Sequence, residues 1–312
     1  MKVLITGVGG FIGSSLAKAL LDLGNIVYGI DNFDKYYSKE QKLENIKYLN
    51  NPDFTFLHLD ILEINKLKVD FSFDVIIHLA AKAGVRNSIK NPISYFKNNV
   101  EGTIKVLDYA VKNNVEKVIF ASSSSVYGEN KRIPWNEESE LLPISPYACS
   151  KISCENLGYT YSKLHNIKFI SLRFFTVYGP KQRPDLAIHK FVKKISNNEE
   201  IEIYGTGDTF RDYTYISDII EGIIKSIEYE GRGFEIFNLG NNKTISLLKL
   251  ISTIEEVLGK NAFMKFLPHQ PGDAPKTFAD ISKSKNLLGY SPKTNLKEGI
   301  ENFYKWYKTE NS

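Results

Sequence analysis

A glycine-rich turn close to the N-terminus constrains the fold more than any other feature of the sequence. The apolar run 2–6 leads directly into Gly7-Val8-Gly9-Gly10-Phe11-Ile12-Gly13, and a helix is predicted over 14–23, ended by Gly24. A strand, a glycine turn and a helix in this order can receive a pyrophosphate at the helix N-terminus. Because the glycine spacing departs from G-x-G-x-x-G, the turn alone fits a dinucleotide site and a plain tight turn equally well.

Acidic residues follow the second and third predicted strands. Asp31 lies at roughly the 20-residue offset at which a carboxylate binds the adenosine ribose hydroxyls, and it would repel a 2′-phosphate. This position favours NAD over NADP, although a turn at a strand end would also accept an aspartate. Asp60 and Ile61 either flank the adenine or serve only the local turn.

Short runs rich in valine and isoleucine alternate with longer helical segments through the first half of the chain. Such alternation is typical of a parallel sheet covered by helices on both faces. The predicted strands lie at 2–6, 26–30, 54–59, 74–79, 117–122 and 168–174. The predicted fold class is therefore α/β, a Rossmann-like doubly wound parallel sheet with a smaller α/β C-terminal substrate-binding region.

The pattern changes after residue 174, where Gly-Pro and Arg-Pro steps interrupt short strand-like pieces, as in loops that close over a ligand. We predict a dinucleotide-binding domain over 1–172, to which 215–243 returns through a strand at 234–239. The regions 173–214 and 244–312 are predicted to bind the substrate. They include a helix at 247–258, with Ser246 as its N-cap and Gly259 beyond its end.

Charge and cysteine content exclude several classes of protein. With 40 basic and 36 acidic residues and no basic run, the chain is not expected to bind nucleic acid. The two cysteines, Cys149 and Cys154, lie on one predicted helix and suit neither a disulfide framework nor a zinc site. No stretch reaches the roughly 20 apolar residues of a membrane span, and no leader precedes the first strand. We expect a cytoplasmic protein without a metal or a membrane partner.

Tyr147 and Lys151 share one face of a predicted helix that opens with Ser145-Pro146, an N-cap followed by proline at the first helical position. Moving a phenol pKa from about 10 to about 7 requires roughly 4 kcal/mol. One ammonium about 4 Å away supplies a comparable amount at an effective dielectric near 20. The pair can therefore act as a general base for an alcohol, although the same spacing is common in plain helix packing.

Five motifs occur in order, with compatible spacing, over essentially the whole chain. They are Thr6-Gly7-x-x-Gly10-x-x-Gly13, His78-Leu79-Ala80-Ala81, the serine-rich run Ser122 to Gly128, Tyr147-x-x-x-Lys151 and Arg173-Phe174-Phe175-Thr176-Val177-Tyr178-Gly179-Pro180. Together they resemble the extended short-chain dehydrogenase/reductase family. The run 174–187, with Asp31-Asn32-Phe33 and Ala83-Gly84-Val85-Arg86, is most similar to the UDP-glucuronate 4-epimerases.

The resemblance implies NAD-dependent 4-epimerisation of a UDP-sugar, UDP-glucuronate to UDP-galacturonate. Tyr147 would be the base, Ser123 would hydrogen-bond the 4-hydroxyl, and Lys151 would hold the nicotinamide ribose and tune Tyr147. The other cofactor-binding residues would be Gly7, Gly10, Phe11, Ile12, Gly13, Asp31, Asn32, Asp60, Ile61, Leu79, Ala80, Ala81 and Asn99. The substrate-binding residues would be Arg86, Ser124, Ser125, Thr176, Arg183, Arg211 and Asp273.

The substrate carboxylate carries most of this expectation. A 4-keto uronate is a β-keto acid that loses carbon dioxide unless its carboxylate is fixed, and Arg183 with the hydroxyls of 124, 125 and 176 could fix it. Family dehydratases have an acidic pair where this chain has Ser124-Ser125, so water elimination is not expected. Gln270 stands where some relatives place an arginine, which leaves Arg211, with Arg86 second, for the diphosphate.

Two alternatives to a uronate epimerase stay open. One is a 4-epimerase of a neutral UDP-sugar, UDP-glucose/UDP-galactose or an N-acetylated form, against which Thr176 and Arg183 argue. The other is a regulator that senses NAD without catalysis, against which Tyr147, Lys151 and Ser123 argue. The resemblance further implies a homodimer, held by a four-helix interface that the predicted helices at 93–113 and 145–164 would form.

Overall fold

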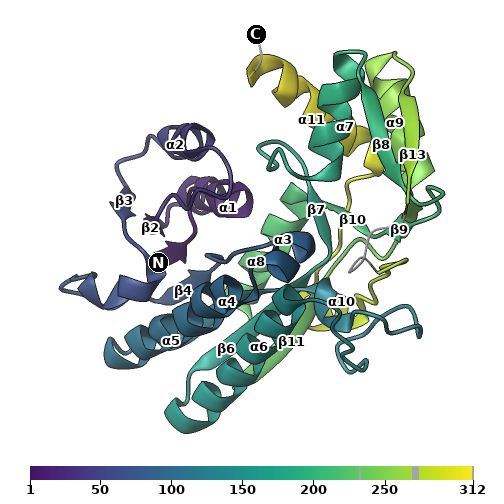
Figure 1. Cartoon of the computed structure of the whole chain (residues 1–312). Coiled ribbons are helices and arrows are strands. Elements are labelled where there is room, and N and C mark those ends of the chain that lie inside the picture. The colour runs from purple at the N-terminus through teal and green to yellow at the C-terminus, as the bar shows by residue number, and fades with distance from the viewer. Residues whose placement is uncertain (232, 269–273, 311–312) are drawn as a thin grey trace.

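The computed structural model describes residues 1–231, 233–268 and 274–310. Its centre is a seven-stranded parallel sheet in the order β11-β6-β5-β4-β1-β2-β3 (Figure 1). The strands are β1 (Lys2–Thr6), β2 (Ile26–Asp31), β3 (Phe54–His58), β4 (Val75–His78), β5 (Lys117–Ser123), β6 (Lys168–Phe174) and β11 (Phe234–Leu239). The strand order reverses between β1 and β4, which is where ligands bind in such folds.

Alternate residues of the central strands pack on opposite faces of the sheet. On β1, Val3 and Ile5 belong to one buried apolar cluster and Leu4 belongs to a second. Helices α1 (Phe11–Asp22) and α8 (Ile216–Glu228) contribute to the first cluster, whereas α5 (Gly102–Lys112) and α6 (Pro146–His165) contribute to the second. Both faces are therefore covered, which explains why the strands are continuous apolar runs in the sequence.

The predicted strands begin and end within one residue of those observed, and the α/β fold class is confirmed. The predicted start of the first helix was wrong: α1 begins at Phe11 rather than Ser14, because Gly10 is extended and serves as its N-cap. Gly13 consequently lies in the first helical turn. Gly24 has a φ of +76°, so the helix ends at the predicted glycine.

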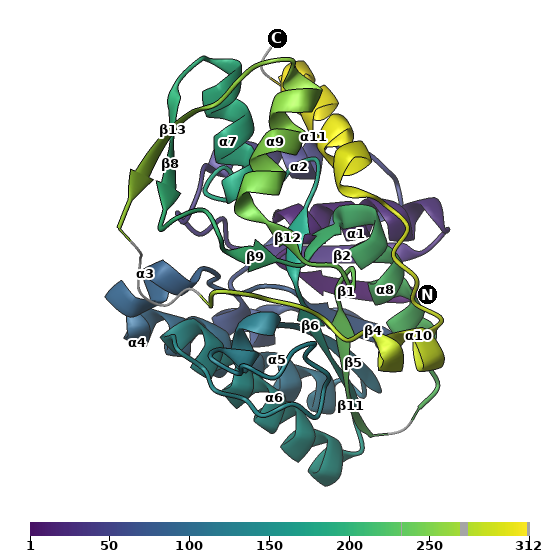
Figure 2. The same cartoon turned by 90° about the vertical axis from the view of Figure 1, so that its right-hand side faces the viewer.

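The second part of the chain builds a cap above the carboxyl edge of the sheet (Figure 2). Its elements are β7 (Thr176–Tyr178), α7 (Ala187–Ser196), β8 (Glu200–Tyr204), β9 (Phe210–Arg211), β10 (Tyr213–Tyr215), β12 (Ile245–Ser246), α9 (Leu247–Leu258), β13 (Phe263–Leu267) and α11 (Leu296–Glu310). Helix α10 (Ser282–Leu288) packs instead against β11 and α8 beside the sheet. The predicted helix at 247–258 is confirmed. Ser246 Oγ accepts from Lys249 N at 3.1 Å, and Gly259 follows with a φ of +64°.

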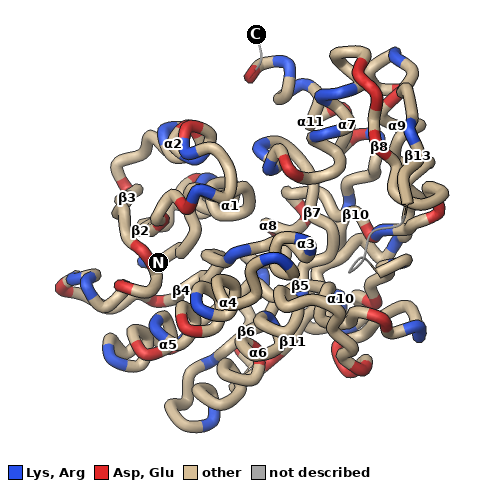
Figure 3. The backbone as a smooth tube through the Cα atoms, viewed as in Figure 1, with Lys and Arg blue, Asp and Glu red and all other residues tan. Residues whose placement is uncertain are grey.

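Shorter helices connect the strands to the covering layers. They are α2 (Lys39–Lys47), a 3₁₀ helix (Ile61–Lys66), α3 (Val85–Lys90), α4 (Pro92–Tyr95), a π-helical turn (Phe96–Glu101) that runs into α5, and a 3₁₀ helix (Ser124–Tyr127). Lys and Arg are interspersed with Asp and Glu over the molecule (Figure 3). Among the residues that the structure describes, no helix has both the length and the hydropathy needed to cross a bilayer.

Candidate active site

A cavity of about 890 Å³ lies between the carboxyl edge of the sheet and the cap. Most residues predicted for the site line it together, although they come from distant parts of the chain. These are Gly7, Gly10, Phe11, Ile12, Gly13, Asp31, Asn32, Ile61, Leu79, Ala80, Ala81, Arg86, Ser123, Ser124, Ser125, Tyr147, Lys151, Thr176, Arg183 and Arg211. Asp60 and Asn99 do not line the cavity, and Asp273 lies outside the described residues.

The glycine turn is packed too closely to admit side chains. Gly7 has a φ of +77°, and a Cβ there would lie 2.8 Å from Ala80 N. A Cβ on Gly13 would lie 2.2 Å from the Gly7 carbonyl oxygen. The turn thus brings bare backbone and the N-terminus of α1 to the cavity, a cradle that fits the pyrophosphate of a dinucleotide.

Asp31 is held at the end of β2 by two backbone amides. Its Oδ2 accepts from Gly9 N at 3.1 Å and its Oδ1 accepts from Phe33 N at 2.8 Å. Burial raises the pKa of the Asp31 carboxyl, whereas the amide of Phe33 and the charge of Lys42 oppose that rise. The carboxylate is therefore fixed beside the glycine turn, where it suits ribose hydroxyls and disfavours a phosphate.

Asp60 and Asn99 hold the loops around this pocket. Asp60 accepts from Asn32 Nδ2 at 2.8 Å and from Leu62 N at 2.9 Å, where it caps a 3₁₀ helix. Asn99 accepts from Lys82 N at 2.8 Å and donates to Ser150 Oγ at 3.0 Å. Direct contact of either side chain with a cofactor stays a prediction.

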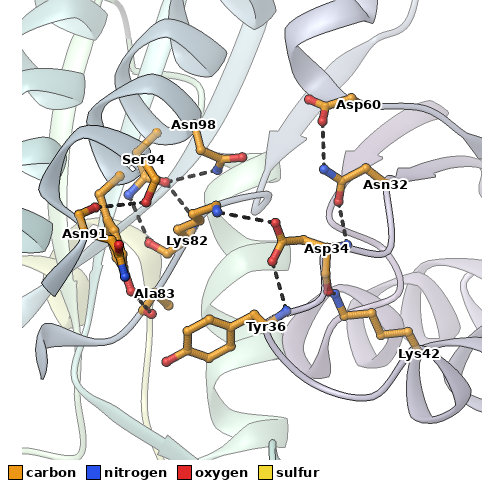
Figure 4. Close-up of polar contacts among 12 residues, drawn as sticks. Asn32, Asp34, Tyr36, Lys42, Asp60, Lys82, Ala83, Asn91, Ser94 and Asn98 are labelled. Carbon is orange, nitrogen blue, oxygen red and sulfur yellow. Dashed lines mark hydrogen bonds and ion pairs between the residues drawn. The ribbon is translucent and has the colours of Figure 1, made fainter. Parts of the chain in front are cut away.

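The loops after β2 and β4 meet across the cavity (Figure 4). Lys82 Nζ lies 3.5 Å from Asp34 Oδ2, and Asp34 also accepts from Tyr36 N at 3.0 Å. Sequence reasoning missed this ion pair, because its partners belong to different loops and only the sheet order brings those loops together. The ion pair thus links the loop after β2, which follows Asp31, to the loop that leads into α3.

Tyr147 opens α6, whose N-cap Ser145 accepts from Ala148 N at 3.2 Å. The Tyr147 phenol hydrogen-bonds Ser123, which stands at the end of β5. Burial raises the pKa of the phenol, and the hydrogen bond from Ser123 works in the opposite direction. A proton acceptor and a hydroxyl thus face the same part of the cavity.

Lys151 is buried one turn further along α6. Its Nζ donates to the Ala121 carbonyl at 2.6 Å and lies 5.9 Å from the centre of the Tyr147 ring. Burial lowers the pKa of Lys151 to about 8, against the opposing charges of Cys154 and Glu155. Taken to the ring centre rather than to the phenol oxygen, that separation corresponds to about 3 kcal/mol of phenolate stabilisation by the ammonium at an effective dielectric near 20; the charge of Arg183 also lowers the phenol pKa. The ammonium of Lys151 alone supplies somewhat less than the roughly 4 kcal/mol that would bring the phenol pKa from about 10 to about 7. The Ser123 hydrogen bond is therefore also required.

Replacement of Lys151 by methionine is expected to move the acid limb of the kcat–pH profile upward by about two pH units. Without the ammonium the Tyr147 phenolate is less stable, so its pKa rises and the base is formed only at higher pH. The check is kcat measured from pH 6 to 10 with saturating cofactor. An acid limb that stays in place would show that Lys151 does not tune the phenol.

A buried ion pair packs against the serine-rich run Ser122 to Gly128. Glu155 of α6 accepts from Arg173 Nε at 3.0 Å and Nη2 at 2.8 Å, and from Ser122 Oγ at 2.6 Å. Arg173 and Glu155 are only 2% and 3% exposed. Arg173 also donates to the Tyr127 hydroxyl at 3.0 Å. The network fixes both ends of the turn that carries Ser123.

His78 lies beneath the cofactor pocket and does not line the cavity. Its Nδ1 lies 2.7 Å from Thr6 Oγ1 and its Nε2 lies 3.1 Å from Thr103 Oγ1. Burial lowers the pKa of the imidazole to about 3, so the ring is neutral. Its position is that of a structural histidine that joins β1 to α5.

Hydroxyls and cations line the cap side of the cavity. Ser125 Oγ donates to Ser123 Oγ at 2.9 Å, and Thr176 begins β7 directly after β6. Arg183 lies in the loop that follows and pairs with Asp185. Arg211 donates through Nη1 to the Phe210 carbonyl at 2.8 Å, further out on the cap. The arrangement can receive an anion near Ser123 and a second anionic group towards the cap.

The fold and the sequence match known proteins over their full lengths. A profile of the GDP-mannose 4,6-dehydratase family matches residues 4–303. The UDP-glucuronate 4-epimerase of Thermodesulfobacterium geofontis strain OPF15 is 40% identical over 313 residues, 98% of this chain and 95% of that protein.

Solved structures of sugar-nucleotide epimerases share the architecture. The UDP-glucuronic acid 4-epimerase from Bacillus cereus, in complex with UDP-glucuronic acid and NAD, has a TM-score of 0.93 at 39% identity and covers 99% of this chain and 100% of its own. The UDP-glucose 4-epimerase with UDP-glucose from Thermotoga maritima has a TM-score of 0.91 at 29% identity, with 100% of both chains covered.

Proposed function

Because the chain belongs to the GDP-mannose 4,6-dehydratase family of extended short-chain dehydrogenases/reductases, we propose that it interconverts UDP-glucuronate and UDP-galacturonate at C4 with bound NAD. The proposal rests on one observation: Tyr147, its hydrogen-bond partner Ser123, and Arg183 all line the same cavity. Positions 124 and 125 are serines, so no carboxyl group stands there. The glycine cradle and Asp31 fit NAD. The chemistry supplied by bound NAD is removal of the C4 hydride and its return to the opposite face of the 4-keto sugar.

The residues of the chain would divide the remaining work. Tyr147 Oη would take the proton of the 4-hydroxyl and later return it, while Ser123 Oγ holds the same oxygen in place. Lys151, anchored on Ala121, would stabilise the phenolate. Arg183, with the hydroxyls at 125 and 176, would hold the sugar carboxylate so that the keto acid keeps its carbon dioxide.

The substrate assignment is tested by incubating the purified protein separately with UDP-glucuronate and UDP-glucose, followed by chromatography and proton NMR. UDP-galacturonate without a UDP-pentose is the expected product of the first reaction. Conversion of UDP-glucose alone would keep the Tyr147/Lys151 chemistry but assign the protein to neutral sugars. NAD that stays bound with no turnover of either compound would favour the non-catalytic regulator.

The proposed domains correspond to the two ligands, NAD and the UDP-sugar. We propose residues 1–172 with 215–243 as the NAD-binding domain, and 173–214 with 244–312 as the UDP-sugar-binding region. The pairing of β11 with β6 supports the return of 215–243 to the main sheet.

We also propose a cytoplasmic location, which the two free cysteines, Cys149 and Cys154, support.

We further propose that two copies of the chain associate through α4–α5 and α6. Ile93 is 83% exposed and Phe96 is 40% exposed on the first of these segments, and Tyr159 is 50% exposed on the second. Ile93→Glu is expected to convert a dimer into a monomer in light scattering coupled to size exclusion, because it places a charge in an apolar interface. Leu23→Glu, at the exposed C-cap leucine of α1, is the matched control. A dimer that survives Ile93→Glu would place the interface elsewhere.

A further inference from the structure

The guanidinium of Arg183 is already engaged by a carboxylate of its own loop. Arg183 Nε donates to Asp185 Oδ1 at 2.9 Å and Nη2 donates to Asp185 Oδ2 at 2.8 Å. Both side chains line the cavity. Two parallel N–H···O bonds are the geometry that a guanidinium offers to any carboxylate. Asp185 therefore occupies the Nε/Nη2 edge of the guanidinium, two of the five donors through which Arg183 could hold the carboxylate of a uronate.

The pair is built into the cavity wall rather than exposed. The Arg183 and Asp185 side chains are 18% and 35% exposed. The Tyr36 ring lies 5.1 Å from the guanidinium carbon, and its hydroxyl donates to Asp185 Oδ2 at 3.5 Å and accepts from Asn87 Nδ2 at 3.0 Å. A Cβ on Gly84 would lie 2.5 Å from that hydroxyl, so the glycine leaves room for it.

Asp185 stays ionised at neutral pH. Its burial works to raise the carboxyl pKa, but the hydrogen bonds and charge of Arg183 lower it overall. A ligand that displaces Asp185 must therefore interact with Arg183 strongly enough to offset the loss of a charge-assisted, partly buried ion pair. A neutral sugar leaves the pair in place, whereas a sugar with its own carboxylate has to compete with Asp185 for the guanidinium.

We propose that Asp185 is a specificity-determining residue, an internal carboxylate that competes with the carboxylate of the sugar for Arg183. The inference rests on the proposed uronate function: Asp185 lowers the preference of the site for charged over neutral sugars, because only a charged sugar has to compete with it for Arg183. The competition also reduces the apparent affinity for the uronate, in proportion to the fraction of time that Arg183 is released.

The test compares Asp185→Asn with its parent in a Tyr147→Phe background, where NAD-loaded protein binds sugar nucleotides without converting them. Calorimetry gives the dissociation constants of UDP-glucuronate and UDP-glucose. We expect the affinity for UDP-glucuronate to rise about tenfold relative to that for UDP-glucose. This is the gain expected if Asp185 occupies Arg183 about 90% of the time in the parent protein, since the apparent affinity scales with the fraction of free Arg183. Asp22→Asn, which removes the same charge from the exposed pair with Lys18, should leave the ratio unchanged.

A double-mutant cycle separates the competition from a general change in charge. In an Arg183→Ala background, Asp185→Asn should no longer alter the ratio of the two affinities; Asp185→Ser repeats the test if the asparagine variant does not fold. Weaker uronate binding, an equal change for both ligands, or an effect that persists without Arg183 would overturn the inference. Wild-type protein that fails to convert UDP-glucuronate would instead overturn the proposed function, and the inference with it.

Discussion

Replacement of Tyr147 by phenylalanine is expected to lower kcat for UDP-glucuronate by about 10²–10⁴-fold, the usual contribution of a positioned general base. The variant loses only the phenol oxygen, which bonds Ser123 and takes the proton of the substrate. The ring keeps its place, where it lies edge-on to Tyr95 at 6.2 Å between centroids. Steady-state rates from NMR product analysis measure the effect.

The same variant should keep its cofactor. NAD content after purification, and the thermal shift on adding NAD, are expected to match the wild type, because the glycine turn and Asp31 lie on β1, α1 and β2 rather than on α6. A rate within threefold of the wild type would remove Tyr147 from the mechanism. Loss of NAD together with loss of rate would show a structural role instead.

Removal of the Glu155 side chain is expected to be the most destabilising single change. Glu155→Ala leaves the guanidinium of Arg173 buried without its carboxylate and also deprives Ser122 and Ser171 of an acceptor. Breaking a buried pair in this way costs about 3–5 kcal/mol. For a chain of 312 residues this corresponds to a fall in Tm of about 5–8 °C.

Two variants control this prediction. Glu138→Ala removes the same group from an exposed position and should change the free energy of unfolding by less than about 0.5 kcal/mol. Glu155→Met combined with Arg173→Met removes both charges, and it should recover much of the lost stability because no buried charge is left unpaired. Equal Tm values for Glu155→Ala and Glu138→Ala would show that the pair contributes little.

Features that depend on local sequence could be predicted well. The strand boundaries follow from continuous apolar runs, and the placement of Tyr147 and Lys151 follows from helical period and from the Ser145-Pro146 start. The glycine turn was recognised from its own spacing, but its helix begins three residues earlier than predicted, at Phe11. Gly10 starts the helix with extended backbone and no side-chain cap, and because glycine is itself a common N-cap residue, the sequence held a signal that the prediction did not use.

Features that depend on contacts between distant loops could not be predicted. Tyr36 and Asp185 are 149 positions apart, and only the docking of the cap on the sheet brings them together. Arg183 was predicted as a ligand for the sugar carboxylate; its pair with Asp185, two residues along the same loop, is a local contact that we did not predict. Asn99 was predicted near the cofactor from resemblance alone, whereas the structure uses its amide to hold the backbone at Lys82.

Transient oxidation at C4 requires that the hydride leave the sugar and return to it within one binding event. UDP-glucuronate deuterated at C4, incubated with the NAD-bound protein in ordinary water, tests this directly by proton and deuterium NMR. The expected product is UDP-galacturonate that retains deuterium at C4. Product that carries solvent hydrogen at C4, or recovery of unchanged UDP-glucuronate, would contradict it.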